Sequence, residues 1–243
     1  MKRRLDVLLV ERGLAPSRQR AQAYILAGKV LVEDRPVTKA GTRFPEDVEI
    51  RVKGPDHGFV SRGGLKLQGA IEQFDVSIKD RTAADLGAST GGFTDCLLQR
   101  GAKRVYAIDV GYGQLAWKIR QDPRVVVMER TNARHLESLD EAVEIVVGDL
   151  SFISLRLILP AIQRIARPGA DCMLLVKPQF EAGKEAIAKG GVVEDAVARA
   201  QAVASVLDDA KRQGFECIDE MCSPIQGAKA GNIEHLIHIR TPA

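Results

Sequence analysis

Polar side chains fall at the ends of several apolar segments that predict buried strands. Asp149 follows one such segment, Lys177 follows the next, and Glu234 opens the last. The carboxyl ends of parallel strands line the crevice in which open α/β sheets bind ligands, and an antiparallel last strand would bring Glu234 to the same edge. Lys66 approaches from a predicted helix ahead of the first of these strands. Two lysines and two acids at one edge suit acid–base chemistry, in which an amine accepts a proton.

Each of these four residues also has an ordinary explanation when it is considered singly. Asp149 fits a strand-end cap, Lys177 a surface charge, and Glu234 a charge that protects an edge strand. Lys66 lies in the first turn of its helix, where the helix dipole disfavours a cation. It is therefore either a surface lysine or a lysine aimed at an anion or a catalytic group. The convergence of all four favours a catalytic set.

The elements that must position this set are organised around a glycine-rich turn, Asp85–Asp95. A short buried strand runs into the turn and a helix follows, so the glycines and the free N–H groups of the helix start are suited to a ligand. A tight turn without a ligand is the alternative. Asp109 ends the next predicted strand at about the twenty-residue spacing of an acid that binds ribose hydroxyls. The turn lacks the Gly-x-Gly-x-x-Gly spacing of dinucleotide-binding proteins, which disfavours a nicotinamide cofactor.

Strand and helix patterns alternate through this part of the chain. The predicted strands are Arg81–Ala84, Arg104–Val110, Arg124–Met128, Ile145–Val147, Asp171–Pro178, Cys217–Ile218 and Glu234–Arg240. The predicted helices are Leu65–Phe74, Cys96–Arg100, Leu155–Ala166 and Glu194–Gln213. Repeated strand–helix units predict an α/β fold with a parallel sheet and right-handed crossovers.

The composition is that of a soluble globular protein large enough for one large domain and one small one. The chain has 243 residues, of which 45% are hydrophobic and 28% charged. No apolar run approaches the length of a membrane span, and charged residues interrupt the N-terminal segment that would otherwise resemble a signal peptide. The four cysteines lack metal-ligand spacing, which indicates reduced thiols in a cytoplasmic protein. We therefore expect neither a metal nor a membrane partner.

Basic charge is concentrated near the N-terminus. Residues 1–53 carry 12 Lys and Arg against 7 Asp and Glu, whereas the rest of the chain carries 23 against 25. This asymmetry favours a polyanionic partner, with an ordinary solvated surface as the alternative. Helices are predicted at Leu5–Arg12 and Arg18–Ala27, and strands at Val30–Val32 and Val48–Val52. We expect a module at 1–53, a linker at 54–59 that is rich in turn formers and contains a solvated His57, and a second domain at 60–243.

The N-terminal module resembles the RNA-binding module named after ribosomal small-subunit protein four. The resemblance rests on Ser17–Ala21, which opens the second helix, and on Gly28–Val32, which follows it. It implies that basic residues of this helix and the next loop contact folded RNA, mainly through its phosphates and shape. The RNA-binding residues predicted in this way are Arg4, Arg12, Arg18, Arg20, Lys29 and Lys39, joined by Arg62 of the second domain.

The second domain resembles S-adenosylmethionine-dependent methyltransferases in its glycine turn. The order Lys66, Asp149, Lys177, Glu234 resembles the Lys-Asp-Lys-Glu set of RNA ribose 2′-O-methyltransferases related to FtsJ. The resemblance implies a Rossmann-like class I methyltransferase with a mostly parallel seven-stranded sheet, and S-adenosylmethionine as cofactor. The cofactor-binding residues predicted in this way are Asp85, Gly87, Ser89, Gly91, Gly92, Phe93, Asp109, Asn132 and Asp149. Among them, Asn132 falls where this superfamily places a contact to adenine.

Longer motifs extend the resemblance to the TlyA family across nearly the whole chain. These motifs are Ser61–Lys66, Asp85–Asp95, Asp109–Leu115, Gly148–Ser154, Lys177–Glu181, and Ser223–Ile225 with Gly231, Asn232 and Glu234. Members of that family are bacterial and cytoplasmic, and they methylate cytidine 2′-hydroxyls in ribosomal RNA. The resemblance implies the same reaction here, with Lys177 as a general base in its neutral form, which burial and the charge of Lys66 would favour. Asp149 and Glu234 would hold the two lysines.

Several alternatives stay open at this point. The short chain ends favour large-subunit RNA as the substrate, with small-subunit RNA as a further possibility. Members of the family are also called haemolysins, so a membrane-lytic protein is the alternative from another class. An RNA-binding ribosome assembly factor with an idle methyltransferase domain is the third. The expected partner is ribosomal RNA or a ribosomal subunit, and the expected state is a monomer or a weak dimer.

Overall fold

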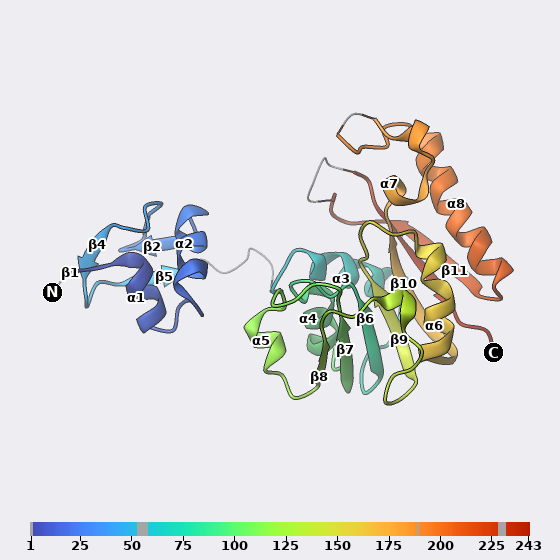
Figure 1. Ribbon diagram of the computed structural model, residues 1–243, viewed down its shortest axis with the longest axis horizontal. Coiled ribbons are helices and arrows are strands. Elements are labelled where there is room, and N and C mark those ends of the chain that lie inside the picture. Colours follow the sequence, from blue (N-terminus) through green and yellow to red (C-terminus); the bar gives the residue numbers. More distant parts are fainter. Residues whose placement is uncertain (1, 53–57, 189, 228–231) are drawn as a thin grey trace. The chain divides into compact units, whose positions relative to one another are not determined.

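The computed structural model describes residues 2–52, 58–188, 190–227 and 232–243 (Figure 1). The chain divides into two compact units, Met1–Gly58 and Phe59–Ala243. Residues 54–57 of the predicted linker, including His57, lie outside the described residues, as does Gly231. In the described part of the chain, no helix has the length and apolar character needed to cross a membrane.

The small unit combines helices with short antiparallel strands. Its elements are β1 (Lys2–Arg4), α1 (Leu5–Glu11), α2 (Arg18–Leu26), β2 (Val30–Val32), β3 (Arg35–Pro36), β4 (Arg43–Pro45) and β5 (Ile50–Val52). Strand β2 lies between β3 and β5, while β1 pairs with β4. The Ser17 hydroxyl accepts a hydrogen bond from the Arg20 backbone N–H at 3.2 Å and so caps α2. Leu5, Leu9 and Ile25 pack in the core of this unit.

The described residues of the large unit form a seven-stranded sheet in the order β11-β12-β10-β9-β6-β7-β8. Its strands are β6 (Thr82–Leu86), β7 (Arg104–Ile108), β8 (Val125–Met128), β9 (Val143–Gly148), β10 (Ala166–Val176), β11 (Glu216–Cys222) and β12 (His235–Arg240). Strands β6 to β10 pair in parallel, and β12 is antiparallel to both β10 and β11. The predicted Rossmann-like fold with a mostly parallel sheet is confirmed.

Helices cover both faces of this sheet (Figure 1). They are α3 (Gly63–Phe74), α4 (Gly92–Gln99), α5 (Trp117–Arg120), α6 (Leu159–Ile165), α7 (Pro178–Glu181) and α8 (Ala196–Arg212). Leu67 of α3 and Leu97 of α4 belong to one buried cluster, and Ile162 of α6 belongs to another. The neighbouring residues Ala83 and Ala84 of β6 join different clusters, because successive side chains of a strand point to opposite faces. The sheet therefore has an apolar core on each side.

The predicted helix Leu155–Ala166 differs from the structure at both ends. A 3-10 turn covers Leu155–Leu157, and α6 begins only at Leu159. Pro160 lies in the first turn of α6, where its missing N–H leaves no hydrogen bond unmade and its fixed φ suits a helix start. Ala166 already belongs to β10, which begins earlier than predicted.

The strand order places a binding crevice at the middle of the sheet. The chain passes from β6 through β7 to β8 and then continues with β9 on the other side of β6. Such a reversal leaves a crevice outside the carboxyl ends of the two strands that flank it. Gly87 follows β6 and Asp149 follows β9, so the fold brings the glycine turn and a predicted catalytic acid to the same crevice.

Candidate active site

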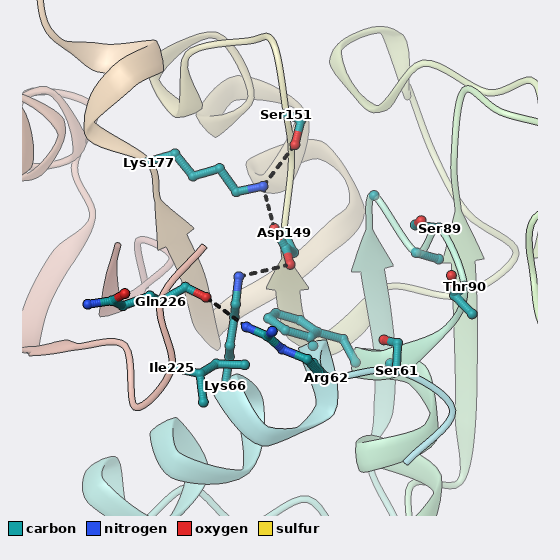
Figure 2. Close-up of a pocket in the computed structure, with 15 residues that line it drawn as sticks. Ser61, Arg62, Lys66, Ser89, Thr90, Asp149, Ser151, Lys177, Ile225 and Gln226 are labelled. Carbon is teal, nitrogen blue, oxygen red and sulfur yellow. Dashed lines mark hydrogen bonds and ion pairs between the residues drawn. The ribbon is translucent and has the colours of Figure 1, made fainter. Parts of the chain in front are cut away.

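Two cavities meet at the crevice between β6 and β9. The first has a volume of about 380 Å³, and Lys66, Asp149 and Lys177 lie in its wall (Figure 2). The second has a volume of about 700 Å³, and Asp109 and Asn132 lie in its wall. The residues common to both walls are Gly87, Ser89, Asp149 and Ser151. A ligand in one cavity and a ligand in the other would therefore meet beside Asp149.

The structure brings the four residues of the predicted catalytic set into one chain of contacts. Lys66 Nζ lies 2.5 Å from Glu234 Oε2 and 3.7 Å from Asp149 Oδ2. Lys177 Nζ lies 2.6 Å from Asp149 Oδ1 and donates a hydrogen bond to Ser151 Oγ at 2.8 Å, as Figure 2 shows. The side chains of both lysines and of Glu234 are at most 10% exposed. The Asp149 carboxylate thus lies between the side-chain nitrogens of two lysines that are largely shielded from water.

A different element supplies each of these side chains. Lys66 belongs to α3, while Asp149 and Lys177 follow β9 and β10. Glu234 directly precedes β12, whose antiparallel register pairs His235 with Val176 at the end of β10. The register of the sheet therefore sets the distances between the strand-end residues, and the packing of α3 adds Lys66.

The glycine turn lies close against the segment that leads into α3 and against the end of β9. A Cβ on Gly92 would lie 2.2 Å from Ser61 Oγ and 2.9 Å from the Gly64 nitrogen. Gly87 has a φ of +85°, and a Cβ there would lie 3.0 Å from the Asp149 backbone oxygen. Of the remaining predicted turn residues, Ser89 and Phe93 line the first cavity, and Gly91 packs against Leu115 and Ile119. The turn requires glycine where it approaches other backbone.

Asp85 lies beneath the turn rather than in the cavity walls that the structure describes. Its Oδ2 accepts hydrogen bonds from the Thr94 backbone N–H at 2.9 Å and from the Thr94 hydroxyl at 2.6 Å. Its Oδ1 is buried and has no hydrogen-bond partner among the described residues. Burial raises the pKa of Asp85 to about 7, against the opposing effect of the Thr94 hydrogen bonds. Asp85 therefore fixes the first turn of α4 and carries an acid that titrates near neutrality.

Asp109 and Asn132 combine a place in the wall of the second cavity with local structural contacts. Asp109 accepts hydrogen bonds from the backbone N–H groups of Ser89 at 2.8 Å and Gly111 at 2.6 Å. Asn132 Oδ1 accepts one from the Arg134 N–H at 3.0 Å and caps the short 3-10 helix that follows. Each carboxylate or amide oxygen retains a second lone pair, so both side chains can still accept from a ligand.

The basic residues predicted to bind RNA have contrasting surroundings. Arg4 and Arg18 both donate to the buried carboxylate of Asp6, each through Nε at 3.0 Å. These guanidinium groups, Arg4 first, hold the pKa of Asp6 well below its usual range, with help from the Gln22 amide. Arg12 donates to backbone carbonyl oxygens of the segment before β5, including that of Val48 at 2.6 Å. Arg12 therefore holds the small unit together, and Arg4 and Arg18 are ordered by Asp6.

The other predicted RNA-binding residues are exposed to solvent. Arg20 lies over the ring of Tyr24, with its guanidinium carbon 5.5 Å from the ring centroid. Lys29 and Lys39 are exposed and make no ion pair within the described residues. Arg62 lies in the wall of the first cavity in the large unit, where it donates to the Gln226 carbonyl oxygen at 3.1 Å (Figure 2).

Sequence reasoning assigned no separate role to Ser151, which the structure places against Lys177. A signal for it was present, because residues two apart in an extended segment point to the same side and Ser151 is two residues after Asp149. Within the described residues, no group of three or more His, Cys, Asp or Glu side chains is arranged to hold a metal ion.

Comparisons with known proteins agree with this fold. An FtsJ-like methyltransferase model matches residues 59–241, and an S4 domain model matches residues 3–50. The 16S/23S rRNA (cytidine-2'-O)-methyltransferase TlyA of Mycobacterium tuberculosis is 48% identical over 241 residues, which cover 98% of this chain and 90% of the relative. Hemolysin A of Brachyspira hyodysenteriae is 41% identical over 238 residues, covering 97% and 98%. A solved structure from Streptococcus thermophilus that carries a hemolysin name has a TM-score of 0.77 and 43% identity, and the match covers 99% of this chain and 89% of that one.

The fold and the site define the large unit as a Rossmann-like methyltransferase domain. The sequence matches allow a narrower statement. The chain belongs to the FtsJ-like methyltransferase family and, within it, to the TlyA-like proteins that carry an S4 domain ahead of the methyltransferase domain.

Proposed function

We propose that the protein methylates the ribose 2′-hydroxyl of a cytidine in ribosomal RNA and uses S-adenosylmethionine as the methyl donor. The observation that carries this proposal is the chain of contacts from Lys177 through Asp149 and Lys66 to Glu234 at the meeting point of two cavities. The TlyA relative with 48% identity is named for this reaction. Large-subunit RNA is the proposed substrate, and small-subunit RNA is a second one to test.

The residues of the second cavity fit S-adenosylmethionine. Asp109 and Asn132 would hold the adenosine part, and the turn from Gly87 onward would face the methionine part, because glycine leaves room for a ligand beside the backbone. Beneath the turn, Asp85 accepts two hydrogen bonds from Thr94 and so fixes the start of the helix that follows the turn. When bound, the cofactor supplies a methyl group already activated on a sulfonium, so that alignment provides much of the catalysis.

Lys177 is the proposed general base. A ribose 2′-hydroxyl is a poor nucleophile that must lose its proton, and Lys177 Nζ accepts this proton as a neutral amine. Asp149 and Ser151 orient Lys177 through contacts at 2.6 Å and 2.8 Å. Glu234 holds Lys66 near Asp149, so the carboxylate of Asp149 is shared between Lys66 and Lys177.

The RNA-binding surface of this proposal belongs largely to the small unit. Arg20, Lys29 and Lys39 are exposed and would contact phosphates, while Asp6 fixes the directions of Arg4 and Arg18. Arg62 would contact the RNA at the first cavity. The proposed division is an RNA-binding module at 1–53, a linker at 54–59 and the methyltransferase domain at 60–243.

The test is methyl transfer with purified protein. Ribosomal subunits, naked ribosomal RNA and labelled S-adenosylmethionine should yield 2′-O-methylcytidine. Lys177→Ala should lower the rate by about 10²–10⁴-fold, the usual contribution of a general base, and leave RNA binding intact. Lys103→Ala, which removes an exposed lysine of the same domain, is the matched control and should keep the wild-type rate.

Two results would contradict the proposal. Label on the cytosine ring instead of the ribose would refute the proposed reaction. A K177A variant with the wild-type rate would refute the role of Lys177 as general base. Lysis of red cells by pure protein, unaffected by K177A and without RNA methylation, would favour the haemolysin alternative instead.

A further inference from the structure

Two strand-end segments carry two of the four predicted catalytic residues. The segment after β9, Asp149–Leu155, contains Asp149 and Ser151 and is called the β9 loop here. The segment after β10, Lys177–Glu181, contains Lys177 and the four-residue helix α7 and is called the β10 loop. Lys177 crosses from one loop to the other, as Figure 2 shows. Its long side chain has many rotamers, so its position depends on where the two acceptors are held.

Glu181 forms a second link between the same two loops. Its Oε2 accepts a hydrogen bond from Ser154 Oγ at 2.6 Å, and its Oε1 accepts one from the Leu155 N–H at 2.7 Å. Arg156 Nε lies 3.5 Å from Oε2. The Glu181 side chain is 1% exposed, so each of its oxygens is occupied within the protein interior.

The β9 loop requires such support because part of its backbone is strained. Phe152 has a φ of +63°, in the left-handed region that a bulky residue rarely adopts. A conformation of this kind is unfavourable and persists only where the surroundings enforce it. At one end of the loop the Asp149 N–H donates to the Leu86 carbonyl oxygen at 3.1 Å, and at the other end Glu181 holds Ser154 and Leu155. Phe152 itself contacts Phe180 of the β10 loop, with ring centroids 5.2 Å apart.

We propose that Glu181 is a positioning residue for the methyl transfer, because it clamps the β9 loop to the β10 loop and so keeps Asp149 and Ser151 within reach of Lys177. This inference rests on the proposed function. Glu181 itself lies in neither cavity wall among the described residues and acts through the loops. Without it, the contact between the Phe152 and Phe180 rings remains, but the hydrogen bonds that hold Ser154 and Leu155 to the β10 loop are lost, so the strained segment can relax.

A purely stabilising role explains Glu181 less well. Burial raises the pKa of the Glu181 carboxyl, because an ion in the protein interior loses its hydration. A buried charged group of this kind is often replaced by an apolar residue at no loss of stability. The hydrogen bonds from Ser154 and Leu155 instead fix the position of the β9 loop relative to Glu181, which an apolar side chain cannot do.

The experiment measures kcat, KM for RNA, cofactor affinity and unfolding by urea for three variants. Glu181→Ala should lower kcat by about 10–100-fold, the effect of a small misplacement of catalytic groups, and leave KM for RNA unchanged. Glu181→Gln keeps an acceptor oxygen and the side-chain shape, so it should recover most of kcat. Glu185→Gln, which changes an exposed acid four positions away, should match the wild type.

A double-variant comparison separates positioning from stability. Ser151→Ala removes one acceptor of Lys177, so the additional loss of kcat caused by E181A should be smaller in the S151A background than in the wild type. If the fold-losses of kcat in E181A and S151A simply multiply in the double variant, the positioning role is overturned. A wild-type kcat for the E181A molecules that have bound cofactor would overturn it as well. A wild-type protein that makes no 2′-O-methylcytidine would refute the proposed function and this inference together, whereas an active wild type with an equally active E181A refutes only the inference.

Discussion

Asp85→Asn tests whether burial keeps a proton on the acid beneath the glycine turn. Asp85 is fully buried, and one of its carboxylate oxygens holds Thr94 through two hydrogen bonds while the other has no partner within the described residues. The amide oxygen of asparagine can accept from Thr94 in the same way. The substitution therefore removes the titration and largely preserves the shape of the side chain.

The magnitude follows from the pKa values of the folded and unfolded states. The Asp85 pKa is raised from 3.8 to about 7 on folding. Between these two pH values the folded protein binds a proton at Asp85 that the unfolded chain has lost. The contribution of protonated Asp85 to the free energy of unfolding is therefore complete below about pH 4 and is lost as pH rises through about 7. The free energy of unfolding then falls by at most about 1.4 kcal/mol per pH unit and by about half of that near pH 7, so the fall between pH 5 and pH 7 is about 2 kcal/mol.

The assay is urea unfolding of the wild type and D85N at several values between about pH 5 and pH 8. Trp117 is the only tryptophan of the sequence and belongs to the large unit, so its fluorescence reports on the domain that contains Asp85. The stability of D85N relative to the wild type should rise by about 2 kcal/mol across this range, because other titrating groups cancel in the comparison. Asp80→Asn, at an exposed acid of the same unit, should show no such trend. A difference between D85N and the wild type that is constant with pH would refute the reasoning.

Three further substitutions test other contacts. Gly92→Ala places a methyl group 2.2 Å from Ser61 Oγ. It should lower the free energy of unfolding in urea by about 1–3 kcal/mol and weaken cofactor binding in calorimetry, and unchanged values would contradict the close approach. Lys29→Ala and Lys39→Ala should each make the plot of log K for RNA binding against log salt concentration less steep, by about 1 in slope; an unchanged slope would exclude a phosphate contact of that lysine. Arg12→Ala should instead destabilise the small unit by about 1–3 kcal/mol, because carbonyl oxygens such as that of Val48 lose their donor; hydrogen exchange of that unit measures this.

The regular part of the fold was predictable because local patterns determined it. The alternation of apolar strands with helices, punctuated by glycine, predicted the sheet of the large unit and the main helices of both units. The pairing of β1 with β4 was not predictable, because Lys2–Arg4 carries no apolar alternation and pairs with a segment about forty residues away. The four-residue helices α5 and α7 are too short to produce a periodic pattern.

The candidate site was predictable to the extent that strand ends converge by topology. Lys66, Asp149, Lys177 and Glu234 lie together because the sheet order brings their elements to one edge. The surroundings of individual side chains were not predictable from residue type. Arg12 resembles any other basic residue of the module in the sequence, yet the structure directs it to backbone carbonyl oxygens. Glu181 likewise stands in a recognisable motif without any indication that it contacts Ser154.

Asp149 links the proposed methyl-donor site at the glycine turn to the proposed general base, Lys177. Its side chain contacts both lysines, and its backbone N–H donates to Leu86 at the end of β6. Its backbone oxygen lies where a Cβ on Gly87 would approach to 3.0 Å, so the glycine turn and the acid are packed against each other without an intervening side chain. A shift of the turn would therefore move the acid, and with it Lys177. In the proposed reaction, the parallel pairing of β6 with β9 would therefore set the distance between a methyl donor held by the turn and a hydroxyl beside Lys177.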